Sequence, residues 1–172
     1  MRYAIRVLSL IVVAVLAGSI AAQATQATGS ASGLPVPRFV SLKADKVLMR
    51  VGPAKNHEVR WLYQRAGLPV EITAEFENWR RIRDSDGADG WVYHSLLSGR
   101  RTGVVIAKSK DDLVPVHEKA DAKSDVVAQL QPGVQGAVKR CNQKWCRISG
   151  QGFDGWVQQE RLWGVYPNET VD

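Results

Sequence analysis

The sequence predicts an all-β protein made of two small domains in tandem. Trp79 and Trp91 recur as Trp145 and Trp156, 66 and 65 positions later, each pair inside a strand-turn-strand pattern that closes with Gly-Trp-Val. Short stretches of alternating apolar and polar residues fill the rest, with Gly, Pro, Asn and Asp between them. Such stretches are typical of strands, and no window shows the 3.6-residue period of a helix.

The N-terminal residues predict export. Arg2 and Arg6 precede an uncharged run from Val7 to Ala22, and Ala22-Gln-Ala24 fits a small-x-small cleavage site. The run is shorter than the roughly 20 residues of a membrane span. We expect residues 1–24 to be a cleaved signal peptide, with an uncleaved membrane anchor as the alternative, and no stable membrane span after cleavage.

Residues 25–38 are small and polar, then rich in proline. A segment of this composition buries too little apolar surface to offset its ordering entropy, so we expect a flexible linker.

The first domain is expected at residues 39–98. Alternation of bulky β-forming residues predicts strands, and Gly52-Pro53 and Ala66-Gly67 predict the breaks between them. The expected strands are 47–51, 59–63, 68–72, 78–82 and 90–93.

The second domain is expected at residues 103–166, after a short join. Gln131-Pro-Gly133 takes the place of Ala66-Gly67, and the last five residues look frayed. The expected strands are 103–107, 113–116, 126–130, 134–140, 145–148 and 155–157.

The motifs in these strands resemble a known family. Val47-Leu-Met-Arg-Val-Gly-Pro53, Gly67, Trp79-x-x-Ile82 and Gly90-Trp91-Val92 resemble the bacterial Src-homology-3 type (SH3b) domain, of the two-copy kind that alphaproteobacteria export. The resemblance implies two tandem SH3-like β-barrels of about five strands each. It also implies a non-enzymatic protein of the periplasm or cell envelope, in a superfamily associated with peptidoglycan or peptide binding.

The second copy departs from this pattern near its second strand. Simple alignment puts Pro115 at the position of Arg50, and His117-Glu118 at the position of Gly52-Pro53. Neither copy carries the acidic, tyrosine-rich groove of the eukaryotic domains, so binding of proline-rich peptides is not implied.

Cys141 and Cys146 are the only cysteines. In an exported chain a pair of cysteines predicts a disulfide. A hairpin that turns at Gln143-Lys144 sets the two directly opposite on antiparallel strands, at a Cα separation that a disulfide accepts. Metal binding needs more ligands than these, and a redox pair is more often Cys-x-x-Cys.

Glu75 and Arg80 occupy the positions of these cysteines in the first copy, 66 residues earlier. We therefore predict a cross-strand ion pair there, where the second copy has its disulfide.

The four repeated tryptophans are the candidate ligand-binding residues. Neighbouring residues of a strand point to opposite faces. If the core is filled by the apolar residues Ile82, Val92, Ile148 and Val157, the outer side of the barrels carries Trp79, Trp91, Trp145 and Trp156. Exposed aromatic rings grip sugars or peptides; the alternative is that loops cover them as a second small core. Arg80 shares the side of Ile82, which requires an open barrel end or a bulge.

Other functional classes find little support. Lys and Arg number 23 against 17 acids, a formal charge of +6, which indicates a soluble basic surface rather than a nucleic-acid partner in an exported protein. His57, His94 and His117 are scattered and expected at the surface. Asp84 to Gly90 lacks the spacing of a calcium loop and predicts a turn.

We therefore expect a non-catalytic envelope module that uses no cofactor, no metal and no catalytic residue. It would bind peptidoglycan or a peptide through Trp79, Trp91, Trp145 or Trp156. The alternative is a periplasmic adaptor that contacts another protein without binding the cell wall. Enzymatic activity is the least supported class, because domains of about 60 residues use most of their apolar groups for their own core.

Overall fold

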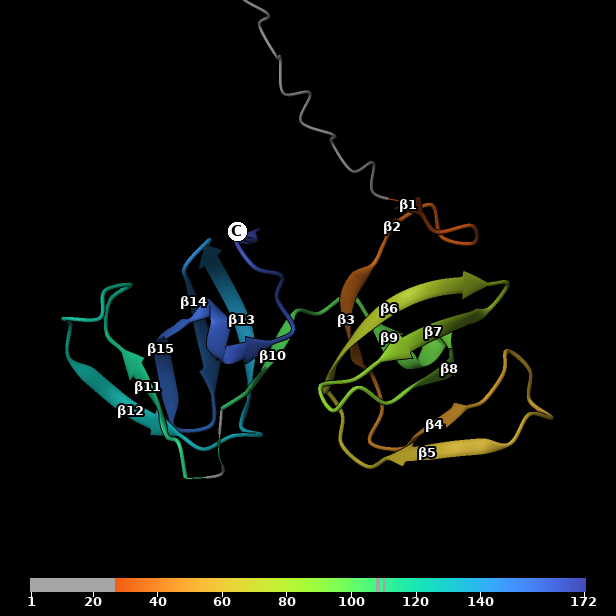
Figure 1. Cartoon of the computed structure of the whole chain (residues 1–172), viewed down its shortest axis with the longest axis horizontal. Coiled ribbons are helices and arrows are strands. Elements are labelled where there is room, and N and C mark those ends of the chain that lie inside the picture. Colours follow the sequence, from red (N-terminus) through yellow and green to blue (C-terminus); the bar gives the residue numbers. More distant parts are fainter. Residues whose placement is uncertain (1–26, 108, 110) are drawn as a thin grey trace, which may run out of the picture.

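The computed structural model describes residues 27–107, 109 and 111–172 and places the two copies side by side as two curled sheets (Figure 1). The expected signal peptide lies outside the described residues. Within them, no helix has the length and hydropathy required to cross a membrane.

The first sheet has seven strands in the order β5-β4-β8-β7-β6-β3-β9, all paired antiparallel. A short 3-10 helix, η1, precedes its last strand. The elements are β3 (Arg38–Leu42), β4 (Val47–Arg50), β5 (Val59–Tyr63), β6 (Pro69–Phe76), β7 (Trp79–Arg83), β8 (Asp89–Tyr93), η1 (His94–Leu96) and β9 (Leu97–Ser98).

The second sheet repeats this order as β12-β11-β15-β14-β13-β10-β16, and β17 pairs with β13. The elements are β10 (Thr102–Val105), β11 (Val114–His117), β12 (Val126–Leu130), β13 (Gln135–Asn142), β14 (Trp145–Gly150), β15 (Phe153–Gln158), η2 (Gln159–Arg161), β16 (Leu162–Trp163) and β17 (Thr170–Val171). Two all-β, SH3-like domains are thus confirmed.

Every expected strand is present, with bounds that shift by a few residues. Sequence reasoning missed β3, whose counterpart β10 it found. Four consecutive residues of β3, Phe39–Leu42, are buried, so the strand lacks the alternation that marks a half-exposed strand. It also missed β9 and β16, which are two residues long and carry no period at all.

Each sheet encloses its own core. Ile82 and Val92 are completely buried in the first, as are Ile148 and Val157 in the second. The strand-parity prediction is confirmed for all four. Trp79 and Trp145 are also buried, but they belong to neither of these two core clusters.

From Ala27 onwards, the segment expected to be a flexible linker contains two short strands. Strands β1 (Ala27–Thr28) and β2 (Pro35–Val36) form a small hairpin. The backbone N–H groups of Ala31 and Ser32 donate to the carboxylate of Glu75, at 3.0 and 2.8 Å. These long-range hydrogen bonds, which no local composition reports, attach the segment to the first domain.

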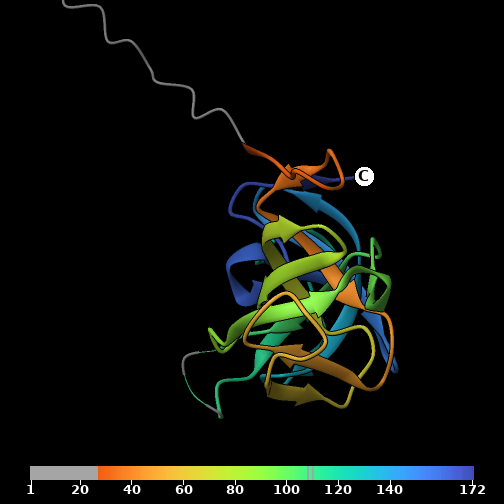
Figure 2. The ribbon, with the colours of Figure 1, turned by 90° about the vertical axis from the view of Figure 1, so that its right-hand side faces the viewer.

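The C-terminal end also differs from the prediction of fraying. Thr170 and Val171 pair with Asn142 and Cys141 of β13, which makes β17 a strand of the second sheet. The β1–β2 hairpin and the C-terminal end both lie on the upper side of the molecule, each above its own domain in Figure 1 (Figures 1 and 2).

The two domains share a packed interface. The hydroxyl of Thr102 donates to the carbonyl of Gly67 at 2.7 Å and lies 2.6 Å from the hydroxyl of Ser41. The indole N–H of Trp163 donates to the carbonyl of Pro69 at 3.3 Å. Gly164 has a positive φ of 115°, and a Cβ there would lie 2.3 Å from the carbonyl oxygen of Thr102, so only glycine fits this junction.

Candidate functional site

In both copies, a side-chain link joins the two strands of the repeated hairpin, as predicted. Cys141 and Cys146 form a disulfide and lie directly opposite, with Cα atoms 4.1 Å apart. Glu75 and Arg80 are opposite in the first copy, with carboxylate and guanidinium 3.2 Å apart. The predicted ion pair is therefore confirmed. A register shift between Ile72 and Ala74 places a bulge in β6, the strand of Glu75, whereas β7 pairs with β8 without a shift, so Arg80 stays on the side of Ile82.

Glu75 carries more contacts than the prediction foresaw. Its side chain is completely buried, and it also pairs with Arg38 at 2.7 Å. Burial disfavours the ionised carboxylate, but hydrogen bonds from Ser32, Arg38 and Ala31 outweigh it and lower the pKa of Glu75 to about 2. The charge pair is thus the centre of a network that joins β6, β7 and the β1–β2 hairpin.

The four candidate tryptophans fall into two classes. Trp79 and Trp145 are each only 9% exposed, which fits the alternative that these rings are covered. Trp91 and Trp156 are half-buried. Trp79 packs edge-on against Tyr93, with ring centres 5.4 Å apart, and Trp145 packs edge-on against His117 at 5.2 Å. Trp79 and Trp145 nevertheless line two different surface hollows.

Trp79 lines a groove of about 280 Å³ in the first domain. Three of the seven lining residues are cations and none is acidic. The set that we call the first-domain groove is Lys46, Leu48, Arg50, Lys55, Trp79, Tyr93 and Leu96. Arg50 donates to the carbonyl of His57 at 2.7 Å, which fixes the loop after β4 beside the groove.

The second domain lacks this charged surface. Arg50 pairs with Trp91 across the sheet, and His117 pairs in the same way with Trp156. His117 is therefore the counterpart of Arg50, and the simple alignment that matched Pro115 with Arg50 is wrong by two residues. Both loops then have the same length, because Arg50 pairs with Val59 and His117 with Val126.

With this register, the three cations of the first-domain groove become apolar or buried residues in the second domain. Leu113, His117 and Ala122 stand at the positions of Lys46, Arg50 and Lys55. His117 is buried, contrary to the prediction of a surface histidine, and its Nδ1 lies 3.0 Å from the carbonyl of Ser124. Its ring fills the space next to Trp145.

Trp145 lines a larger hollow, a cleft of about 680 Å³ between the two domains. The first domain contributes Phe39, Glu71 and Arg83. The second domain contributes Ile106, Gln143, Lys144, Trp145, Gln158, Gln159, Glu160, Leu162, Trp163, Val165, Tyr166, Pro167 and Asn168. We call this the interdomain cleft.

A network of charges and rings joins the walls of the interdomain cleft. Glu71 accepts from Nε of Arg83 at 3.0 Å and from the hydroxyl of Tyr166 at 3.0 Å. Burial and the charge of Glu71 raise the pKa of Tyr166, so its hydroxyl stays protonated. The guanidinium of Arg83 lies 5.9 Å from the centre of the Trp163 ring, within cation–π range.

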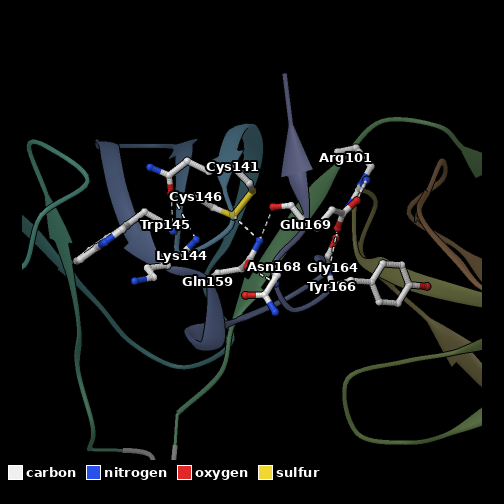
Figure 3. The surroundings of a disulfide bond; sticks show 11 residues. Arg101, Cys141, Lys144, Trp145, Cys146, Gln159, Gly164, Tyr166, Asn168 and Glu169 are labelled. Atoms are coloured by element: carbon white, nitrogen blue, oxygen red, sulfur yellow. Dashed lines mark hydrogen bonds and ion pairs between the residues drawn. A yellow bond between two sulfur atoms is a disulfide. The ribbon is translucent and has the colours of Figure 1, made fainter. Parts of the chain in front are cut away.

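The C-terminal loop that borders the cleft is held in place by Glu169. Glu169 pairs with Arg101 at 2.8 Å and accepts from the backbone N–H of Tyr166 at 2.8 Å. Burial disfavours its ionisation, but Arg101 and this N–H lower the pKa of Glu169 overall. Figure 3 shows Asn168 and Glu169 of this loop between the disulfide and Tyr166, whose ring points toward the first domain.

Other sequence candidates have structural roles. Asp84 accepts from the hydroxyl of Tyr63 at 2.9 Å and from the N–H of Ala88 at 2.8 Å, which confirms the turn. His57 and His94 are exposed, as expected. Among the described residues, no group of three or more His, Cys, Asp or Glu side chains is arranged to hold a metal ion.

Sequence reasoning missed Trp61 and the whole interdomain cleft. Trp61 is 56% exposed, but it lies outside the repeated motif. In its strand, the neighbours Arg60 and Leu62 are exposed as well. An alternating sequence pattern does not reveal that consecutive residues of a strand are all exposed. The cleft joins residues far apart in the chain, so no local pattern reports it.

Comparison with known proteins agrees with this architecture. The sequence profile of the family described as "Bacterial SH3 domain" matches twice, at residues 43–99 and 110–164. No curated protein matches this chain in sequence.

Solved structures that are similar to this chain include NlpC2 and NlpC1 from Trichomonas vaginalis. Each is 12% identical to this chain with a TM-score of 0.33, and the matches cover 74% and 78% of this chain. The matched region spans 48% of each of those proteins, so this chain corresponds to about half of their length.

Proposed function

Because this chain belongs to the bacterial SH3 domain family, we propose that it is an exported, non-catalytic module that binds peptidoglycan or a peptide in the cell envelope. A disulfide persists in the oxidising compartments outside the cytoplasm, which supports export. The ligand surface of this proposal is the first-domain groove.

The observation that carries the proposal is the composition of that groove. Trp79 and Tyr93 offer an apolar aromatic wall, and Lys46, Arg50 and Lys55 surround it without any acidic residue. Aromatic rings give large contact area with few rotors to freeze. Cations that face no acid in the same groove select a ligand that carries carboxylates, such as the acidic peptides of the cell wall.

The test is a pull-down with purified sacculi and with a soluble carboxylate-bearing stem peptide. Wild-type protein is expected in the bound fraction. The double variant Lys46→Ala/Lys55→Ala should bind about two- to thirtyfold more weakly, since each rim charge contributes about 0.2–1 kcal/mol. Added salt should weaken wild-type binding because the charges are exposed.

The matched control is Lys119→Ala/Lys123→Ala, which removes the same charge from exposed positions of the second domain. It should bind like wild type. Complete recovery of the wild-type protein in the unbound fraction would contradict the proposal.

A second candidate is an adaptor that contacts another envelope protein. It is favoured by exposed apolar side chains on the edge hairpin β4–β5, where Leu48, Trp61 and Leu62 are 41%, 56% and 41% exposed. The same pull-down separates the two candidates, because an adaptor without cell-wall affinity stays unbound in the presence of pure sacculi.

A further inference from the structure

We propose that the interdomain cleft is a second binding site and that it takes an uncharged sugar chain. This inference rests on the proposed envelope function, and it adds a site that neither domain can form alone. Its location differs from the first-domain groove, and its chemistry differs as well.

The size and position of the cleft fit a ligand site. A hollow of about 680 Å³ lies within the range of pockets that hold small ligands, and such pockets are frequent between domains. Among its lining residues, Phe39, Leu162 and Val165 are buried, and Trp163 and Tyr166 are half-buried. These rings offer flat apolar surface of the kind that packs against the C–H faces of sugars.

The walls of the cleft are held in place before any ligand arrives. Tyr166 bonds to Glu71 across the interface, and Trp163 bonds to the carbonyl of Pro69. The rings of Phe39 and Trp163 meet edge-on with centres 5.1 Å apart. A preorganised site loses little entropy on binding.

Glu71 and Arg83, the charged residues that the first domain contributes to the cleft, are already paired with each other. One carboxylate oxygen of Glu71 accepts from Arg83 and the other accepts from Tyr166. A charged ligand group would lose its water there without gaining an unpaired partner, which is unfavourable. At the rim, exposed Lys144 and Glu160 have opposite charges. The cleft therefore disfavours a strongly charged ligand, unlike the first-domain groove.

The rim instead carries neutral hydrogen-bonding groups. Gln143, Gln158 and Asn168 are exposed, and each side-chain amide both donates and accepts. Hydroxyl and acetamido groups of sugars need both functions. Gln158 stands two residues after Trp156, where the first copy has Tyr93 two residues after Trp91, so this amide surface belongs to the second copy alone.

The test uses the N-acetylglucosamine tetramer, which is uncharged and free of peptide, in calorimetric and NMR titrations. Wild-type protein should bind it, with the largest shift at the indole N–H of Trp163. Gln158→Ala should weaken binding about three- to tenfold through loss of hydrogen bonds. Adding Gln143→Gly should weaken it further, and glycine suits the positive φ of 74° at that position.

Two controls separate this inference from the proposed function. Gln129→Ala, at an exposed glutamine of β12, should leave sugar binding unchanged. Lys46→Ala/Lys55→Ala should weaken sacculus binding but leave sugar binding intact. No sugar binding by wild type, or equal binding by Gln158→Ala, overturns the second site even where sacculi are bound. If the wild-type protein binds the sugar tetramer but does not bind sacculi, the proposed function is overturned instead.

Discussion

At the scale of single residues, Glu75 shows how one position is used differently in two copies of a fold. Its counterpart is Cys141, which has a covalent partner, whereas Glu75 relies on Arg80 and Arg38. Exposed ion pairs contribute little, but this carboxylate is completely buried. Removing one member of a buried pair is costly because its partner charge stays behind.

Glu75→Gln should therefore lower the free energy of unfolding at pH 7 by about 2–4 kcal/mol. Urea denaturation measures it, and Glu58→Gln, at an exposed glutamate, is the control and should change stability little. Equal stability of Glu75→Gln and wild type would contradict the structural role of the network.

The same residue predicts a pH dependence. Its pKa falls from the ordinary value of 4.5 to about 2 on folding, so the folded state favours the ionised form. Its stabilisation is complete above the unfolded pKa and is lost as pH falls from about 4.5 toward about 2. Wild type should therefore lose more stability than Glu75→Gln over this window.

At the scale of elements, the β13–β14 hairpin (Gln135–Asn142 and Trp145–Gly150) shows how far sequence patterns reach. The hairpin, its disulfide and its cross-strand register could all be predicted, because each depends on spacings of a few residues. The strand that pairs with β13, β17, could not be predicted. Its two residues carry no period, and only pairing with Cys141 and Asn142 makes them a strand.

The disulfide should stabilise the second domain modestly. The free energy of unfolding of the double variant Cys141→Ala/Cys146→Ala should be about 2 kcal/mol lower than that of wild type. The effect is modest because the loop that the disulfide closes is short. Alanine has no polar side-chain atom, so neither buried position gains an unsatisfied polar group. Denaturation of wild type with and without a reductant gives an independent measure, and identical curves for all three samples would contradict the expectation.

At the scale of the whole molecule, the interface makes one unit of two domains that each have a separate core. Hydrogen bonds from Thr102, Trp163 and Tyr166 cross between them. The described part of the chain should therefore unfold in one coupled transition rather than in two.

Tyr166→Phe tests this coupling with the smallest change. It leaves a buried oxygen of Glu71 without the donor that Tyr166 provides, which should cost about 1–3 kcal/mol and broaden or split the transition. Calorimetry measures it. Tyr93→Phe, at a half-buried tyrosine remote from the interface contacts, should keep the wild-type transition, and an unchanged profile for Tyr166→Phe would show that this bond does not couple the domains.

The sequence by itself determined the repeat, the longer strands other than β3, the inward side of Ile82, Val92, Ile148 and Val157, the disulfide, and the charge pair at the same position of the first copy. These features depend on periods and spacings within one hairpin, where backbone geometry fixes which side chains meet. Only the tertiary structure decided which tryptophans are covered, how the two copies align at Arg50 and His117, and where the interdomain cleft lies. Its key contact joins Tyr166 to Glu71, 95 residues apart, and contacts at that distance depend on how whole domains pack rather than on any local pattern.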